Sequence, residues 1–155
     1  MNVAASVAGT APDYDSVAEG TELPQSRFRI RRVDLIRYCG ASGDFNVIHW
    51  NERAARAVGL PDVIAHGMLT MATVARIVTD WAGDPGAVVE YAVRFSRPVV
   101  VPDDEEGAEL VVTGRVSEKL PGSRVRVDLV ARSGSDSAGW NKVLSMARAV
   151  VVLPL

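Results

Sequence analysis

Apolar residues recur at helical spacing through the first half of the chain. Residues 33–39 place them on one face, which predicts a short helix. A second short helix is predicted over 52–58, because Asn51 is a good N-cap and Gly59 a good residue to follow a helix. Over 68–81 apolar residues cover nearly the whole helical circumference, so we expect protein to enclose this longer helix on most sides.

The second half of the chain alternates apolar and polar residues with the period of two that is typical of half-buried strands. The predicted strands are a short early one at 28–30, then 91–95, 110–116, 125–129 and 143–153. Short, turn-rich stretches at 121–123 and 133–139 suit antiparallel connections. These patterns predict an α+β fold in which a curved antiparallel sheet wraps one long central helix.

Size and charge limit the classes of protein that fit. The 155 residues favour one compact domain, and the net charge of -2 gives no general attraction to nucleic acid. We expect residues 1–20, rich in small residues and without periodicity, to be a flexible leader, and residues 21–155 to form the single domain. The acidic run at 103–106 is expected to be a solvated turn.

Cysteine usage and hydropathy bear on the compartment. Cys39 stands alone, so the chain can form no intrachain disulfide and offers no cysteine-based zinc site, which favours a reducing compartment. The first residues lack the pattern of a secretory signal, so the cytoplasm is expected. Residues 68–81 are too short, and too interrupted by Arg76 and Asp80, to span a membrane. No metal or redox cofactor is suggested, because the two histidines are too differently placed to form a ligand set.

A carboxylate, an amide and an imidazole lie within six residues, at Asp44, Asn46 and His49. The apolar neighbours Phe45 and Val47 suggest that Asp44 is partly buried, which disfavours the charged form of a carboxyl group unless a partner offsets it. An imidazole within reach could exchange a proton with this carboxyl, which is the basis of general acid/base catalysis. The residues alone leave the alternative open that Asp44 and Asn46 hold a turn and that His49 is an ordinary core histidine.

His66 and Gly67 stand where the long helix is expected to begin. Free backbone N–H groups and the positive end of the helix dipole converge at such a position. Gly67 has no side chain to block approach, so a thioester carbonyl placed there would be polarised and an enolate oxygen stabilised. The alternatives are that Gly67 only permits close packing and that His66 only caps or lines the helix entrance.

Two segments together resemble the motif of a known family. Residues 38–49, which read YCGASGDFNVIH, and residues 65–68, which read AHGM, are similar in order and spacing to the hydratase-2 motif of the MaoC-like (R)-specific enoyl hydratases and dehydratases. Residues 83–86 and 90–95 also look like the catalytic subunit of the actinobacterial, mycolate-type (3R)-hydroxyacyl-ACP dehydratase. The resemblance covers most of the chain after about Asp15.

That resemblance implies a hot-dog fold, catalysis by Asp44 and His49, and substrate binding by Asn46, His66 and Gly67, with the Gly67 N–H holding the thioester oxygen. The implied reaction is reversible dehydration of (3R)-hydroxyacyl thioesters to trans-2-enoyl thioesters. The implied partners are an acyl-CoA or acyl-carrier-protein thioester and a second hot-dog subunit, in a homodimer or a heterodimer. Functions of other classes remain as alternatives: a non-catalytic partner subunit or acyl-binding module, and a hot-dog thioesterase.

The chain departs from the family's pattern at two positions. Val47 stands where proline is usual, which removes a fixed φ and is expected to loosen the loop. Ala75 stands where some relatives place a serine near the catalytic carboxylate. Neither change removes an atom that the proton transfers require.

Five arginines crowd the early part of the chain: Arg27, Arg29, Arg31, Arg32 and Arg37. One hypothesis is that an acidic carrier protein docks near them. The other interpretation is a solvated basic face without a partner.

Overall fold

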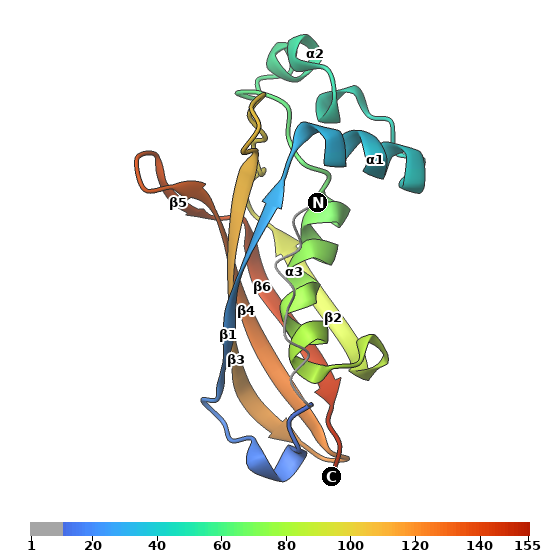
Figure 1. Cartoon of the computed structure of the whole chain (residues 1–155), viewed down its shortest axis with the longest axis vertical. Coiled ribbons are helices and arrows are strands. Elements are labelled where there is room, and N and C mark those ends of the chain that lie inside the picture. Colours follow the sequence, from blue (N-terminus) through green and yellow to red (C-terminus); the bar gives the residue numbers. More distant parts are fainter. Residues whose placement is uncertain (1–10) are drawn as a thin grey trace.

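A strongly curved antiparallel sheet holds the long helix α3 (Gly67–Ala82) against its concave face (Figure 1). The computed structural model describes residues 11–155. Along the sheet the strands follow the order β1 (Glu22–Ile30), β3 (Ala108–Leu120), β4 (Arg124–Ser135), β6 (Leu144–Val152) and β2 (Val88–Phe95), and the short β5 (Gly139–Lys142) pairs with β4. All of these pairs are antiparallel, as predicted.

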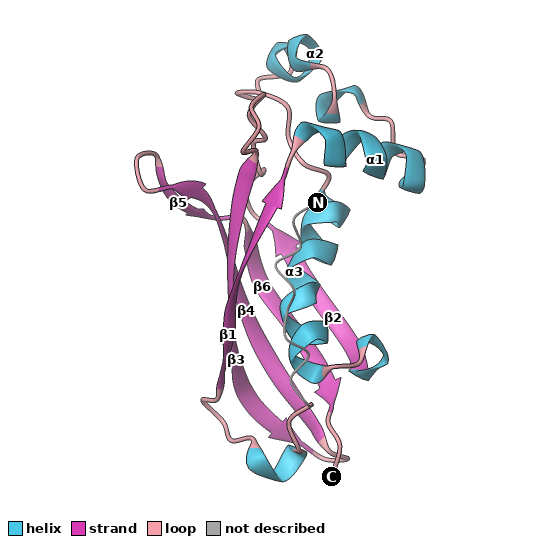
Figure 2. Cartoon of the chain, viewed as in Figure 1, coloured by secondary structure: helices cyan, strands magenta, loops and turns pink. Residues whose placement is uncertain are grey.

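The remaining helical elements are short. Helices α1 (Arg32–Ser42) and α2 (Glu52–Ala57) lie beyond the end of the sheet where α3 begins (Figure 2). Three 3-10 turns complete the set: η1 (Tyr14–Ser16), η2 (Val47–His49) and η3 (Pro85–Ala87). Among residues 11–155, no helix combines the length and hydropathy that crossing a membrane requires.

Helix boundaries follow the local residues closely. Helix α2 is capped as predicted, because the Asn51 side chain accepts a hydrogen bond from the Ala54 N–H. Helix α1 continues past its expected end to Ser42, where Gly43 stops it in the left-handed conformation, at φ 75°. That stop turns the chain sharply just before Asp44.

The core lies between the concave face of the sheet and one face of α3. Along most of β3 and β4 every second residue points inward and is buried, which confirms the predicted alternation. These residues include Leu110, Val112, Val116, Val125, Val127 and Leu129. They belong to the same core cluster as Val74, Ile77 and Val78 of α3, and full burial of each such side chain contributes roughly 1.5–3 kcal/mol.

The exposed residues of α3 are Gly67 and one stripe, formed by Met68, Ala72, Arg76 and Asp80, and the others are buried or half-buried, so protein meets the helix on most sides, as expected. One expectation about the neighbouring elements is wrong. The stretch 133–139, expected to be a loop, instead contains the end of β4 and the start of β5.

The expected flexible leader is wrong for residues 14–20. The Tyr14 N–H donates to the Pro154 carbonyl, and Val17 is buried. The Lys119 ammonium donates to the carbonyls of Tyr14 and Val17, at 2.7 and 2.8 Å. Sequence composition missed this anchoring because it depends on a lysine about a hundred residues away. Residues 1–10 of the expected leader lie outside the described residues.

The acidic run behaves as predicted. All of its side chains are exposed, and Asp104 Oδ1 accepts hydrogen bonds from the Glu106 and Gly107 N–H groups. It is a solvated turn that leads into β3.

Candidate active site

The loop after α1 is built from successive side-chain to backbone hydrogen bonds. Asp44 Oδ1 accepts from the Asn46 N–H at 3.1 Å, and Asn46 Oδ1 accepts from the Ile48 N–H at 3.3 Å. The turn-holding role considered for both residues is therefore present. The expected partial burial of Asp44 is wrong, because Asp44 is exposed and Phe45 is 62% exposed. The apolar neighbours point outward instead of covering the carboxylate.

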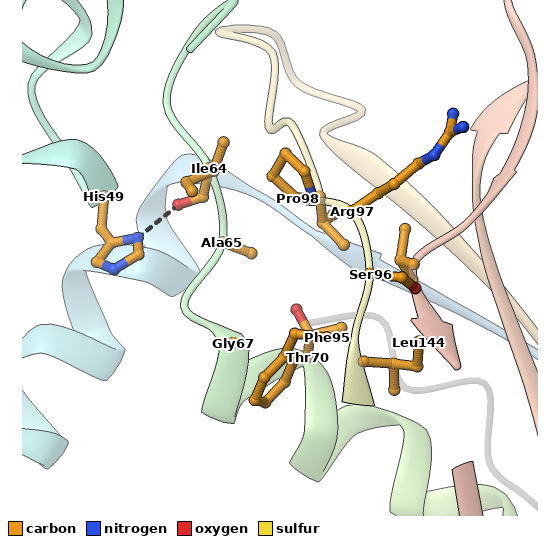
Figure 3. A pocket seen from close by; sticks show the side chains of 12 residues that line it. His49, Ile64, Ala65, Gly67, Thr70, Phe95, Ser96, Arg97, Pro98 and Leu144 are labelled. Atoms are coloured by element: carbon orange, nitrogen blue, oxygen red, sulfur yellow. Dashed lines mark hydrogen bonds between the residues drawn. The ribbon is translucent and has the colours of Figure 1, made fainter. Parts of the chain in front are cut away.

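His49 ends the η2 turn and is 7% exposed. Its Nδ1 lies 2.8 Å from the Ile64 carbonyl oxygen, the contact drawn in Figure 3. Because a carbonyl can only accept, Nδ1 carries the hydrogen and Nε2 keeps a lone pair. The fold thereby fixes the tautomer in which Nε2 can take up a proton.

His66 lies directly against His49 and is 1% exposed. Its Nε2 donates to the Asp44 carbonyl at 3.1 Å and lies 3.6 Å from Cys39 Sγ. Its Nδ1 is buried and has no hydrogen-bond partner among the described residues. Burial lowers the pKa of His66 below the usual 6.5, the nearby His49 lowers it further, and the Asp44 carbonyl opposes the shift.

The expected substrate-binding role of His66 is not supported. The ring is covered by Tyr38, Cys39 and His49 and does not line the cleft described below. It joins the Asp44 loop to the start of α3 instead. Asn46 is likewise absent from the cleft lining, in agreement with its role in holding the loop.

The structure brings the proposed acid/base pair together. A carboxylate oxygen of Asp44 and ring nitrogens of His49 and His66 all lie within 4.8 Å of one another. A metal ion requires ligands whose lone pairs converge on one point. Here the two rings are stacked, and His49 Nδ1 and His66 Nε2 already form hydrogen bonds. The arrangement suits proton transfer better than metal binding.

A cleft of about 300 Å³ opens beside His49 (Figure 3). Gly67 lines it as the first residue of α3, so its N–H has no acceptor within the helix. The Phe95 ring packs directly over Gly67: a Cβ atom at Gly67 would lie 3.2 Å from the ring edge. The remaining lining is mostly apolar and comprises Ile64, Ala65, Thr70, Ser96, Arg97, Pro98, Val99, Val143 and Leu144.

Sequence reasoning missed several of these contributors. The Ile64 carbonyl that orients His49 is a backbone group, so its role could not be predicted from the type of residue at position 64. The segment 96–99 was assigned no function, yet it lines one side of the cleft. The sequence feature that could have indicated this segment is Arg97-Pro98, a charged residue and a proline directly after a predicted strand.

The free basic face considered for the early arginines is not present. Each of the five forms an ion pair with a carboxylate, which reduces the attraction of this surface for an acidic partner. The pairs are Arg27–Glu109, Arg29–Glu106, Arg31–Asp34, Arg32–Asp62 and Arg37–Asp34.

Comparisons with known proteins show which family the chain is similar to. The model of a family described as MaoC like domain matches residues 15–132. The chain is similar to a 3-hydroxyacyl-thioester dehydratase X of Mycobacterium tuberculosis, with 44% identity over 51% of this chain and 27% of that protein. It is also similar to an (R)-specific enoyl-CoA hydratase of Rhodospirillum rubrum, with 31% identity over 68% of this chain and 73% of that protein.

A solved structure described as a MaoC-like dehydratase superposes with a TM-score of 0.85 and 41% identity. The match covers 92% of this chain and 42% of that one. The chain therefore spans less than half the length of two of the relatives that it matches.

Proposed function

Because the chain belongs to the MaoC-like domain family and has its hot-dog fold, we propose that it catalyses the reversible dehydration of (3R)-hydroxyacyl thioesters to trans-2-enoyl thioesters. The observation that carries this proposal is the approach of the Asp44 carboxylate to the His49 imidazole, within 4.8 Å. His49 lines the same cleft as Gly67. A substrate in this cleft would meet His49 and the Gly67 N–H donor, and Asp44, which does not itself line the cleft, would act from beside His49.

The proposed chemistry follows from these three groups. The Gly67 N–H donates a hydrogen bond to the thioester oxygen, which makes the C2 proton more acidic and stabilises the enolate. His49 Nε2 takes the C2 proton, since its Nδ1–H is held by Ile64. The pair then delivers a proton to the departing C3 hydroxyl, which leaves as water. In hydration, Asp44 and His49 position and deprotonate water.

Alternatives of other classes are less well supported. A non-catalytic subunit or acyl-binding module needs no carboxylate beside a tautomer-fixed imidazole, yet both are present here. A thioesterase would direct water at the carbonyl carbon and release free thiol. Cytoplasmic location is part of our proposal and is supported by the single cysteine, which is buried and reduced.

Absorbance of an enoyl thioester separates these functions. We expect the protein to remove the absorbance of a trans-2-enoyl-CoA without releasing thiol to Ellman's reagent, and to form the (3R) product. Asp44→Asn serves as the inactive control. Thiol release by the wild-type protein at the rate of absorbance loss would indicate a thioesterase instead.

We also propose that a second hot-dog subunit, either another copy or a related chain, covers the exposed stripe of α3 and the edge of β2. Strand β2 ends the sheet order, and Val89 and Phe95 on it are exposed, as is Met68 of α3. Exposed apolar side chains along an unpaired strand edge are a typical interface. Light scattering should show a dimer that Val89→Lys dissociates, whereas Ile36→Lys, at an exposed position on α1, should not.

A further inference from the structure

Arg97 lines the side of the cleft away from His49, on the segment that follows β2 (Figure 3). It is the one lining residue with a permanent positive charge. Its Nη1 donates to Asn141 Oδ1 at 2.6 Å. Because Asn141 is a neutral amide, this bond holds the guanidinium in place without cancelling its charge.

Arg97 belongs to the arginines of the described residues that form no ion pair. Within residues 11–155, no carboxylate lies at ion-pair distance from its guanidinium, whereas Arg27, Arg32 and Arg126 each have one. An arginine that is oriented but not neutralised presents several N–H donors to an anion from outside. One side of the cleft therefore carries the positive charge of Arg97, and no carboxylate of the described residues neutralises it.

The backbone at this position is fixed as well. The Ser96 and Arg97 N–H groups both donate to the Val143 carbonyl, at 3.0 and 3.3 Å, and Pro98 restricts the residue before it. The backbone of Arg97 is thus hydrogen-bonded to the residue before β6, and its guanidinium is hydrogen-bonded to β5. A binding group with both ends held loses less side-chain entropy when an anion arrives.

We propose that Arg97 binds the phosphate of the 4′-phosphopantetheine arm that carries the thioester substrate. The proposal rests on the proposed function, because it places the thioester at Gly67 and His49. In such an arm the sulfur is followed by amide groups and then by the phosphate. Gly67, Ser96 and Arg97 all line the cleft, so its lining includes a backbone N–H for the thioester, a hydroxyl for an amide and a guanidinium for the phosphate.

Coenzyme A and acyl carrier proteins share this phosphate, so the test compares carriers of the same trans-2-enoyl group: pantetheine, phosphopantetheine, coenzyme A and a carrier protein. A hydrogen bond to a charged group contributes about 1.5–3 kcal/mol, and at an exposed, screened site we expect the lower end, about tenfold. Arg97→Gln should therefore lower kcat/KM about tenfold for the three phosphorylated carriers, mainly through KM. Turnover of the pantetheine thioester should stay within about twofold, because it lacks the phosphate.

The matched control is Arg132→Gln. Ser133 is the Cα partner of Asn141, so the adjacent Arg132 points to the opposite face of the sheet. This variant removes one positive charge without touching the cleft, and all four rates should be unchanged. Comparable wild-type rates on coenzyme A and carrier-protein thioesters would indicate that the protein recognises the phosphopantetheine arm that both share. A large difference would show which of the two carriers the protein prefers.

Three results would overturn the phosphate site while leaving the proposed function intact. They are an equal loss on all four thioesters, no loss on any, and a loss confined to coenzyme A, which would assign Arg97 to a nucleotide phosphate. A wild-type protein that hydrates none of the four would overturn the proposed function, and the phosphate site with it.

Discussion

The imidazole rings of His49 and His66 are stacked, with centroids 3.7 Å apart and planes 24° from parallel. Two positive charges at this separation would repel each other strongly, and His66 has almost no access to solvent. Burial therefore lowers the pKa of His66 and disfavours its charged form, while His49 lines the cleft. The buried ring also donates to the Asp44 carbonyl, so it holds the loop of Asp44 next to the ring of His49, the two residues of the proposed acid/base pair.

We predict that His66 acts as a positioning residue. His66→Gln keeps an N–H donor near the Asp44 carbonyl, whereas His66→Leu keeps bulk without the donor. We expect kcat to fall at least about tenfold in His66→Leu and clearly less in His66→Gln, because misplacing a proton-transfer group by about 1 Å is costly. KM should change little in both, since His66 does not line the cleft. Equal kcat values for the two variants would contradict the role of the hydrogen bond.

The lowered pKa of His66 predicts how stability depends on pH. In the unfolded chain His66 takes up a proton near pH 6.5, while the folded protein resists protonation, because burial and the nearby His49 disfavour the charge. The unfolded state then binds more protons, so the free energy of unfolding should fall as pH drops from about 6.5 toward the lowered folded pKa. Urea denaturation across this range should show the fall in wild type and a smaller one in His66→Gln. An unchanged slope in the variant would assign the pH dependence to other groups.

The acid/base pair is tested by removing one group at a time. Asp44→Asn and His49→Ala should each lower turnover of an enoyl thioester by at least about 10²-fold, the effect of one positioned proton-transfer group. Both should keep the wild-type circular dichroism spectrum. Asp103→Asn makes the same chemical change in the exposed turn before β3 and should be fully active. Near-normal rates in either site variant would refute the assignment.

The sequence predicts the parts of this site that depend on neighbours along the chain. Asp44, Asn46 and His49 lie within six residues, so their spacing marked a candidate loop, and the resemblance to the family then implied their roles. His66 could not be placed in the same way: its depth depends on Tyr38 and Cys39, which reach it only after folding. The exposure of Asp44 was also inaccessible, because apolar neighbours in a sequence do not reveal which way a loop turns.

The same distinction applies to the fold. Alternation identified β3 and β4 because one face of each is buried against α3. Strand β5 has no buried residue, so it left no alternating signal and is defined by its pairing with β4. The exposed stripe of α3 contains the two charged residues of the helix, Arg76 and Asp80, so most of the apolar positions that periodicity identified are the ones that meet protein.

The close approach of Phe95 to Gly67 gives a test of the cleft itself. Gly67→Ala keeps the backbone N–H but places a Cβ atom 3.2 Å from the Phe95 ring, which is 52% exposed and must move. We expect a loss of activity of about tenfold or more with little change in melting temperature, because the displaced ring lies in the cleft and not in the core. Phe95→Ala should restore activity to Gly67→Ala if steric displacement is the cause, and a double-mutant cycle measures this coupling.

Gly40→Ala is the control: nothing lies within 4 Å of its Cβ position on α1, so it should stabilise the protein by roughly 0.5–1 kcal/mol and leave turnover unchanged. Full activity in Gly67→Ala would show that substrate does not pass between Phe95 and the start of α3.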